Sequence, residues 1–96
     1  MMSFDLSQHA QVRAKQRGIS RECVLLISRL ADRRTRVSGL AHALSISDRG
    51  RDRCIASGLP PAKMERARGV VVIADLAAAR IITVEHRLGR RRLIRR

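Results

Sequence analysis

The sequence predicts a small α+β domain, with N-terminal helices packed on a three- to four-stranded, mainly antiparallel sheet. Three observations indicate this fold class. Ninety-six residues suffice for one domain with a modest core. An apolar stripe with the helical period runs over 23–31, and two β-branched runs, 70–73 and 81–84, lie close together further along. Because Phe4 is the one aromatic residue, the core must be built from aliphatic side chains.

The first predicted helix follows a short alternating segment, 4–6, which we expect to form an edge strand. Ser7 is a good N-cap for this helix, and Gly18 is a good residue to end it. At about 100° per residue, four polar side chains fall within an arc of roughly 100°. They are His9, Arg13, Gln16 and Arg17. This face predicts one edge of a phosphate-binding groove, and the alternative is a solvated basic helix.

The second predicted helix begins after Ser20, a good N-cap. Its apolar residues recur at three- and four-residue spacing, which is typical of a helix with one face in the core. Glu22 in the first turn suits the helix dipole. We place Arg33 and Arg34 in the last turn, where cations are favourable for the same reason.

The middle of the chain predicts one strand followed by two short helices. Apolar and polar residues alternate over 37–46, which indicates a strand with an irregularity at Gly39. A weakly apolar segment, 47–57, forms the first short helix in this prediction. Pro60 and Pro61 start the second, which runs to Arg68.

The C-terminal third predicts an antiparallel hairpin at the centre of the sheet, built from the two β-branched runs. Its connection, 75–79, lacks the Gly or Asn that a tight turn favours. Six of the last ten residues are Arg. We therefore divide the chain into one domain, 1–88, and a basic tail, 89–96.

The charge balance limits the function. The chain has 21 Lys and Arg against 8 Asp and Glu, a formal net charge of +13, and such a surface favours polyanions. No apolar run approaches the roughly 20 residues that span a bilayer, and no signal peptide is evident, so we expect a cytoplasmic protein without membrane contact. Cys23 and Cys54 lie far apart without metal-ligand spacing. We therefore expect free thiols, no metal site and no cofactor.

Two end motifs carry a resemblance to a known family. Residues 9–19 read H-A-x-x-R-x-x-x-R-G-I, and residues 82–87 read I-T-V-x-H-R. The chain resembles a bacterial family of domains of unknown function with these motifs, which itself is similar to the RelE/BrnT-type toxin superfamily. The family has a Gly in the last hairpin turn, where this chain has Ala77 to Ala79. The resemblance implies helices on one face of an antiparallel sheet and an RNA-cleaving, toxin-like activity.

Cleavage of RNA without metal requires a proton-transfer group and cations that stabilise the phosphate. His9 and His86 are the candidate catalytic residues, because imidazole titrates near neutral pH. They face one another if the first helix crosses the sheet near the end of the last strand. The candidate nucleic-acid-binding residues are Arg13, Arg17, Arg87, Arg90, Arg91 and Arg92. We expect His42, on an apolar strand face, to be a hydrogen-bonded structural residue.

Two hypotheses about function follow. The first is a toxin-like RNA-binding protein that acts as a metal-independent endoribonuclease, with an acidic, antitoxin-like protein covering the groove between the first helix and the last strand. The alternative is a non-catalytic basic module that binds nucleic acid or an acidic protein, such as an inhibitor or accessory factor of a mobile element. The scarcity of aromatic residues argues against a reader of single strands that stacks bases.

Overall fold

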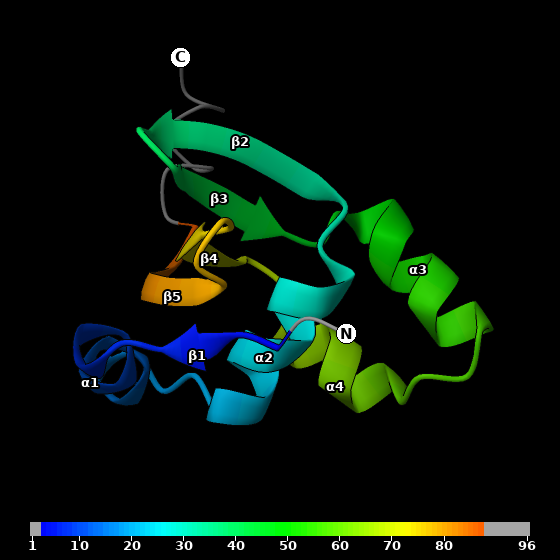
Figure 1. Cartoon of the computed structure of the whole chain (residues 1–96). Coiled ribbons are helices and arrows are strands. Elements are labelled where there is room, and N and C mark those ends of the chain that lie inside the picture. Colours follow the sequence, from blue (N-terminus) through cyan, green and yellow to red (C-terminus); the bar gives the residue numbers. More distant parts are fainter. Residues whose placement is uncertain (1–2, 88–96) are drawn as a thin grey trace, which may run out of the picture.

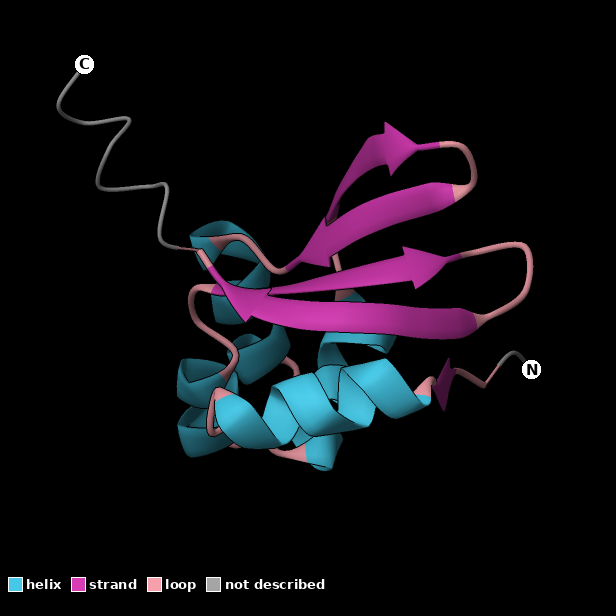
Figure 2. Cartoon of the chain, turned by 90° about the vertical axis from the view of Figure 1, so that its left-hand side faces the viewer, coloured by secondary structure: helices cyan, strands magenta, loops and turns pink. Residues whose placement is uncertain are grey.

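One mixed sheet and four helices make up the fold, as the computed structural model shows for residues 3–87 (Figures 1 and 2). The five strands are β1 (Asp5–Leu6), β2 (Arg33–Ser38), β3 (Ala41–Ser45), β4 (Val70–Asp75) and β5 (Arg80–His86). Their order across the sheet is β1-β5-β4-β3-β2. The α+β class is thus confirmed. The predicted tail, 89–96, with Arg90, Arg91 and Arg92, lies outside the described residues.

The sheet has more strands than the three to four predicted. The pairs β2–β3, β3–β4 and β4–β5 are antiparallel, as expected, whereas β1 pairs in parallel with β5. The hairpin of β4 and β5 lies inside the sheet, which confirms its predicted central place. β1 and β5 are not consecutive in the chain, so no hairpin turn forces them to run in opposite directions. After β1 the chain continues into α1, which runs beside β5.

Serine caps define where three of the four helices begin. The helices are α1 (Gln8–Gln16), α2 (Arg21–Leu30), α3 (Asp48–Ala56) and α4 (Pro61–Arg66). The side chains of Ser7, Ser20 and Ser47 accept hydrogen bonds from backbone N–H groups in the first turns of α1, α2 and α3. The N-caps Ser7 and Ser20 match the prediction. Pro61 begins α4, where the fixed φ of proline suits the first turn of a helix.

The structure corrects two predictions about the middle of the chain. The alternating segment 37–46 is not one strand: Gly39, at φ +50°, turns the chain between β2 and β3. Arg33 and Arg34 are not in the last turn of α2, which ends at Leu30, but in β2. All six residues of β2 are exposed, so this strand has no apolar alternation by which the sequence could reveal it.

The core lies between the sheet and the helices. Val72 and Ala74 of β4 and Val24 and Ile27 of α2 have no exposed surface or almost none. Ala10 of α1 is likewise fully buried. This small side chain lets α1 approach β5 closely, so that the polar residues of α1 lie along the edge of the sheet.

Candidate nucleic-acid interface

The predicted groove between the first helix and the last strand corresponds to the α1–β5 edge. The Ser7 hydroxyl donates to the Ile82 carbonyl oxygen (3.1 Å), and a ring nitrogen of His86, Nε2, lies 3.1 Å from the Arg17 carbonyl oxygen. Helix α1 therefore runs alongside β5 in the same direction. Its first turn lies near Ile82, and its last turn lies near His86.

The two candidate catalytic histidines do not face one another. His9 is in the first turn of α1, eight residues before Arg17. At about 1.5 Å per residue, this places its backbone roughly 12 Å from the end of the helix, where His86 lies. His9 is exposed, and its ring has no hydrogen-bond partner within residues 3–87. The geometry therefore does not provide an acid–base pair made of these two residues.

Arg13 has a structural contact at this edge. Its guanidinium lies 3.9 Å from the Glu85 carboxylate, and about a third of its side chain is exposed. Arg17 is exposed, with no ion-pair partner in the described part of the chain. The contact of Arg13 is of the kind expected if this residue anchors α1 to the sheet, the structural alternative to phosphate binding.

A basic cavity lies where β2 and β4 begin and where β3 and β5 end, beside the first turn of α3. It has a volume of about 460 Å³, and its walls carry Arg33, Arg49, Arg68 and Arg87. We call it the arginine cavity. Its four arginines come from β2, from the first turn of α3, from the segment after α4 and from the end of β5. Only Arg87 among them was a predicted site residue.

Strand register explains how Arg87 and Arg33 come together. Arg33 pairs with Ser45 of β3, so these side chains share one face of the sheet. The Arg87 backbone N–H donates to the Gly69 carbonyl oxygen, and its guanidinium donates to the Ser45 hydroxyl at 2.9 Å. Ser45 thus holds the Arg87 side chain across β4 and toward Arg33.

Positive charge predominates in the arginine cavity. Arg68 has an ion pair with Glu65 (3.3 Å), whereas Arg33 and Arg49 have no ion-pair partner among residues 3–87. One acidic residue, Asp48, also lines the cavity, and it pairs with Arg51 (2.5 Å). Arg33, Arg49 and Arg87, which have no ion-pair partner among residues 3–87, leave a positive potential in a concave site. One planar guanidinium can donate two parallel hydrogen bonds to the oxygens of a phosphate group. The cavity is therefore suited to phosphate groups.

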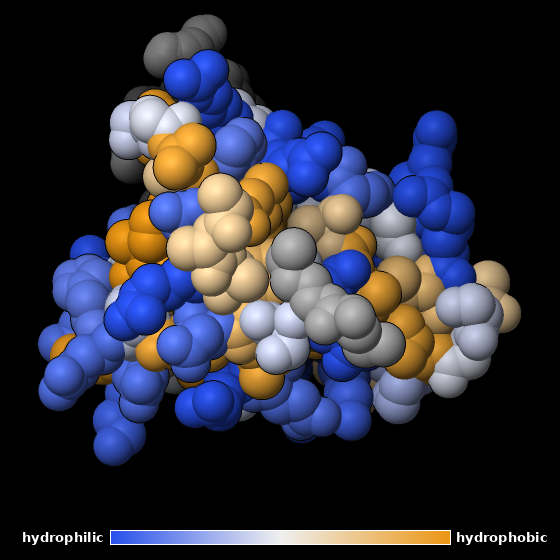
Figure 3. All heavy atoms as spheres, in the orientation of Figure 1, coloured by the Kyte–Doolittle hydropathy of each residue, from blue (hydrophilic) through white to orange (hydrophobic). Residues whose placement is uncertain are grey.

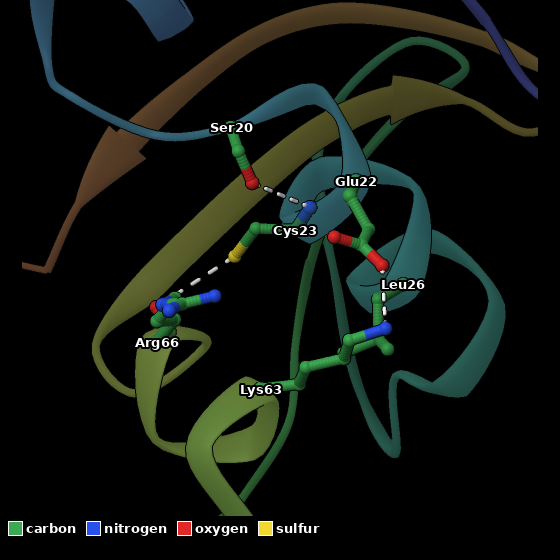
Figure 4. A pocket seen from close by; sticks show the side chains of 6 residues that line it. All are labelled: Ser20, Glu22, Cys23, Leu26, Lys63 and Arg66. Carbon is green, nitrogen blue, oxygen red and sulfur yellow. Dashed lines mark hydrogen bonds and ion pairs between the residues drawn. The ribbon is translucent and has the colours of Figure 1, made fainter. Parts of the chain in front are cut away.

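A small crevice lies between α2 and α4 (Figure 4). Lys63 and Glu22 form an ion pair of 2.7 Å, which holds the pKa of the Glu22 carboxyl below its usual range. The Cys23 thiol lies 3.6 Å from the Arg66 carbonyl oxygen, and burial raises its pKa. The volume of about 10 Å³ accommodates one water at most. Cys23 is therefore a protonated core residue and a poor nucleophile.

The described residues offer neither a metal site nor a membrane span. Residues 3–87 contain no group of three or more His, Cys, Asp or Glu side chains placed to hold a metal ion. No helix in the same part of the chain has the length and apolar character needed to cross a membrane. Cys23 and Cys54 are both free. His42 is half-buried, with Nδ1 3.3 Å from the Leu40 carbonyl oxygen.

Comparisons of the chain with protein-family models, with curated proteins and with solved structures found no significant match. The resemblance to a toxin-like family therefore rests on the two end motifs and stays a prediction.

Proposed function

We propose that this chain is a toxin-like RNA-binding protein that holds RNA phosphates in the arginine cavity. The observation that supports this best is the convergence of four arginines, from four separate parts of the chain, on one concave site. Gathering like charges costs electrostatic free energy in the unbound protein, and bound phosphates offset that cost. The net charge of +13 adds long-range attraction for the same ligand.

The mode of binding in this proposal is recognition of the backbone. Contacts to phosphate fix the position of a nucleic acid without reading its sequence. Aromatic side chains are the main stacking platforms for unpaired bases, and Phe4 is the one aromatic residue of the chain. Affinity should therefore depend strongly on salt and weakly on RNA sequence.

Arg49→Ala tests the role of the cavity. Arg49 is exposed in the first turn of α3, where Ala is a favourable helix residue, so folding should persist. We expect affinity for a fluorescein-labelled single-stranded RNA to fall about tenfold, as for removal of one charge-assisted hydrogen bond. Arg21→Ala is the matched control, because it removes an exposed arginine from the first turn of α2, outside the cavity. An equal fall in affinity in both variants would contradict a phosphate site in the cavity.

Cleavage of the bound RNA is the second function that we consider, and His86 is the residue that favours it. A carbonyl oxygen accepts hydrogen bonds only, so the contact with Arg17 requires a proton on Nε2 of His86. In the neutral ring, Nδ1 is then free to act as a base. His86→Ala should abolish cleavage of a labelled RNA on a denaturing gel, whereas His9→Ala should retain it. Absence of cleavage by the wild-type chain would favour the non-catalytic alternative.

A further inference from the structure

Three arginines without an ion pair give the arginine cavity more positive charge than one internal phosphate of RNA neutralises. Arg33, Arg49 and Arg87 all line this cavity. An internal phosphodiester carries one negative charge and two free oxygens. A terminal phosphomonoester carries about 1.5 to 2 negative charges at pH 7 and three acceptor oxygens. Because each guanidinium can donate two parallel hydrogen bonds, the monoester complements the three arginines better in charge and in number of acceptors.

The size and position of the cavity fit one nucleotide. Its volume, about 460 Å³, lies within the range of roughly 300 to 1,000 Å³ that is typical of pockets enclosing one small molecule. Figure 3 shows hydrophilic side chains over most of β2 and the neighbouring start of α3. Proteins that bind a passing single strand use a basic groove that follows its backbone. Here the cations come from several elements and surround one space.

Hydrogen bonds fix the elements that carry these arginines. The Asp32 carboxylate accepts from the Ser47 backbone N–H (2.8 Å) and hydroxyl (2.6 Å). Asp32 directly precedes Arg33, and Ser47 caps the helix turn that carries Arg49, so this contact joins the two arginine-bearing segments. The Arg87 guanidinium is held by its hydrogen bond to β3 (2.9 Å). The site is therefore formed before a ligand binds, which lowers the entropic cost of binding.

The acidic residue of the cavity does not cancel this charge. The Asp48 carboxylate forms an ion pair with Arg51, and a tenth of the Arg51 side chain is exposed. The same guanidinium contacts Glu65 at 3.5 Å and so links the first turn of α3 to α4. A buried cation thus neutralises Asp48, and the charge that remains for a ligand is positive.

We propose that the arginine cavity binds the terminal phosphate of an RNA, a phosphomonoester at its 5′ or 3′ end, together with the terminal nucleotide. This inference rests on the function proposed above and specifies its ligand. The chain then recognises phosphorylated RNA ends, and internal phosphates contribute to affinity through the overall charge.

The test compares RNAs of one sequence, about ten nucleotides long, with fluorescein on an internal base so that both ends are free. One form carries a 5′ phosphate, another a 3′ phosphate, and the third has hydroxyls at both ends. We expect the full chain to bind one of the phosphorylated forms at least about tenfold more tightly than the hydroxyl form, as for one charge-assisted hydrogen bond. The preferred form identifies the end.

A hydroxyl-ended RNA one nucleotide longer is the matched control, because it has as many phosphate groups as the phosphorylated forms. It should bind like the shorter hydroxyl form. Binding of this control as tight as that of both phosphorylated forms would overturn recognition of the end and leave the proposed function intact. Failure of the wild-type chain to bind any of these RNAs would overturn both.

Protein variants locate the terminal phosphate. Arg33→Ala should remove the preference for the phosphorylated end. Arg34→Ala, on the same strand, should retain it, because neighbouring side chains of a strand point to opposite faces and Arg34 does not line this cavity. Both residues are exposed, so folding should persist, and thermal melts check this. An undiminished preference in Arg33→Ala, or an equal loss in both variants, would overturn the placement of the RNA end in the cavity.

Discussion

At the scale of single residues, Gly50 determines how closely α3 packs on the chain before β2. A Cβ atom at this position would lie 2.5 Å from the nearer carboxylate oxygen of Asp32. That carboxylate cannot move freely, because it accepts hydrogen bonds from the Ser47 backbone N–H (2.8 Å) and hydroxyl (2.6 Å). Gly50→Ala should therefore lower the free energy of unfolding by about 1 to 3 kcal/mol, measured by urea denaturation.

A double-mutant cycle separates this clash from helix propensity. With Asp32 already changed to Ala, the neighbour of the new methyl group is gone. Gly50→Ala should then stabilise the protein by up to about 1 kcal/mol, the usual advantage of Ala over Gly within a helix. A destabilisation of the same size in both backgrounds would show that the carboxylate is not the obstacle.

Asp32 also predicts a dependence of stability on pH. Hydrogen bonds from the Ser47 side chain and backbone hold the pKa of the Asp32 carboxyl below its usual value. A lowered pKa in the folded state stabilises the protein above the unfolded-state pKa, and this contribution is lost as the pH falls through the folded-state pKa. We expect the wild-type chain to lose stability below about pH 4 more steeply than Asp32→Asn, in urea titrations between about pH 2.5 and 6. Asp52→Asn, an exposed residue of α3, is the control and should follow the wild-type profile.

At the scale of elements, the sequence predicts those features that depend on neighbouring residues alone, such as the N-caps of helices. Ser7 and Ser20 are N-caps in the structure because a hydroxyl that accepts from the first turn is available at each position. The strand β2 was missed because periodicity reports which face is buried, and β2 buries neither face. The predicted strand 37–46 therefore combines β3 with the turn at Gly39 and the last residues of β2.

The turn between β4 and β5 shows how this chain forms a hairpin without the expected glycine. Ala79 adopts φ +53°, a left-handed conformation that is rare for residues with a Cβ atom. The Asp75 carboxylate accepts a hydrogen bond from the Ala78 backbone N–H (3.1 Å) and so stabilises the turn. The aspartate at the start of the turn is thus a sequence signal that an expectation of Gly or Asn alone does not include.

Ala79→Gly should stabilise the protein. It removes a left-handed strain of about 1 to 2 kcal/mol and adds about 0.5 to 1 kcal/mol of backbone entropy loss on folding. We expect a net gain of about 0.5 to 1 kcal/mol and a higher melting temperature. Ala77→Gly is the matched control in the same turn, because Ala77 does not have a positive φ, and it should give no gain. A gain of equal size at Ala77 would mean that the strain at Ala79 is not its cause.

At the scale of the whole molecule, the candidate site was only partly predictable. Successive arginines of the cavity are 16 to 19 residues apart in the chain: Arg33, Arg49, Arg68 and Arg87. Such a spacing does not place side chains together on one helix or strand. The order of the strands and the placement of α3 bring them together. The sequence pattern instead grouped the residues of α1, which share a face by helical geometry alone. Charge predicted a polyanionic partner, but only the tertiary structure placed the positive charge in a cavity.

The salt dependence of RNA binding distinguishes the cavity from the charge of the whole chain. For single strands, the slope of log affinity against log salt decreases in magnitude by about 0.7 for each phosphate that the protein no longer neutralises. Arg49→Ala should therefore change the slope by about 0.7. Deletion of residues 90–96, which removes five arginines, should change it by a larger amount.

The two changes should add in a combined variant, because contacts to separate phosphates release separate counterions. Thermal melts of each variant check that the domain remains folded. An unchanged slope after the deletion would show that these five arginines do not contact RNA, and the charge that binds it would then lie within residues 3–87. An unchanged slope in Arg49→Ala, with a reduced slope after the deletion, would instead assign phosphate binding to the terminal arginines and contradict the cavity. These slopes therefore determine whether the fold, or only its net charge, recognises RNA.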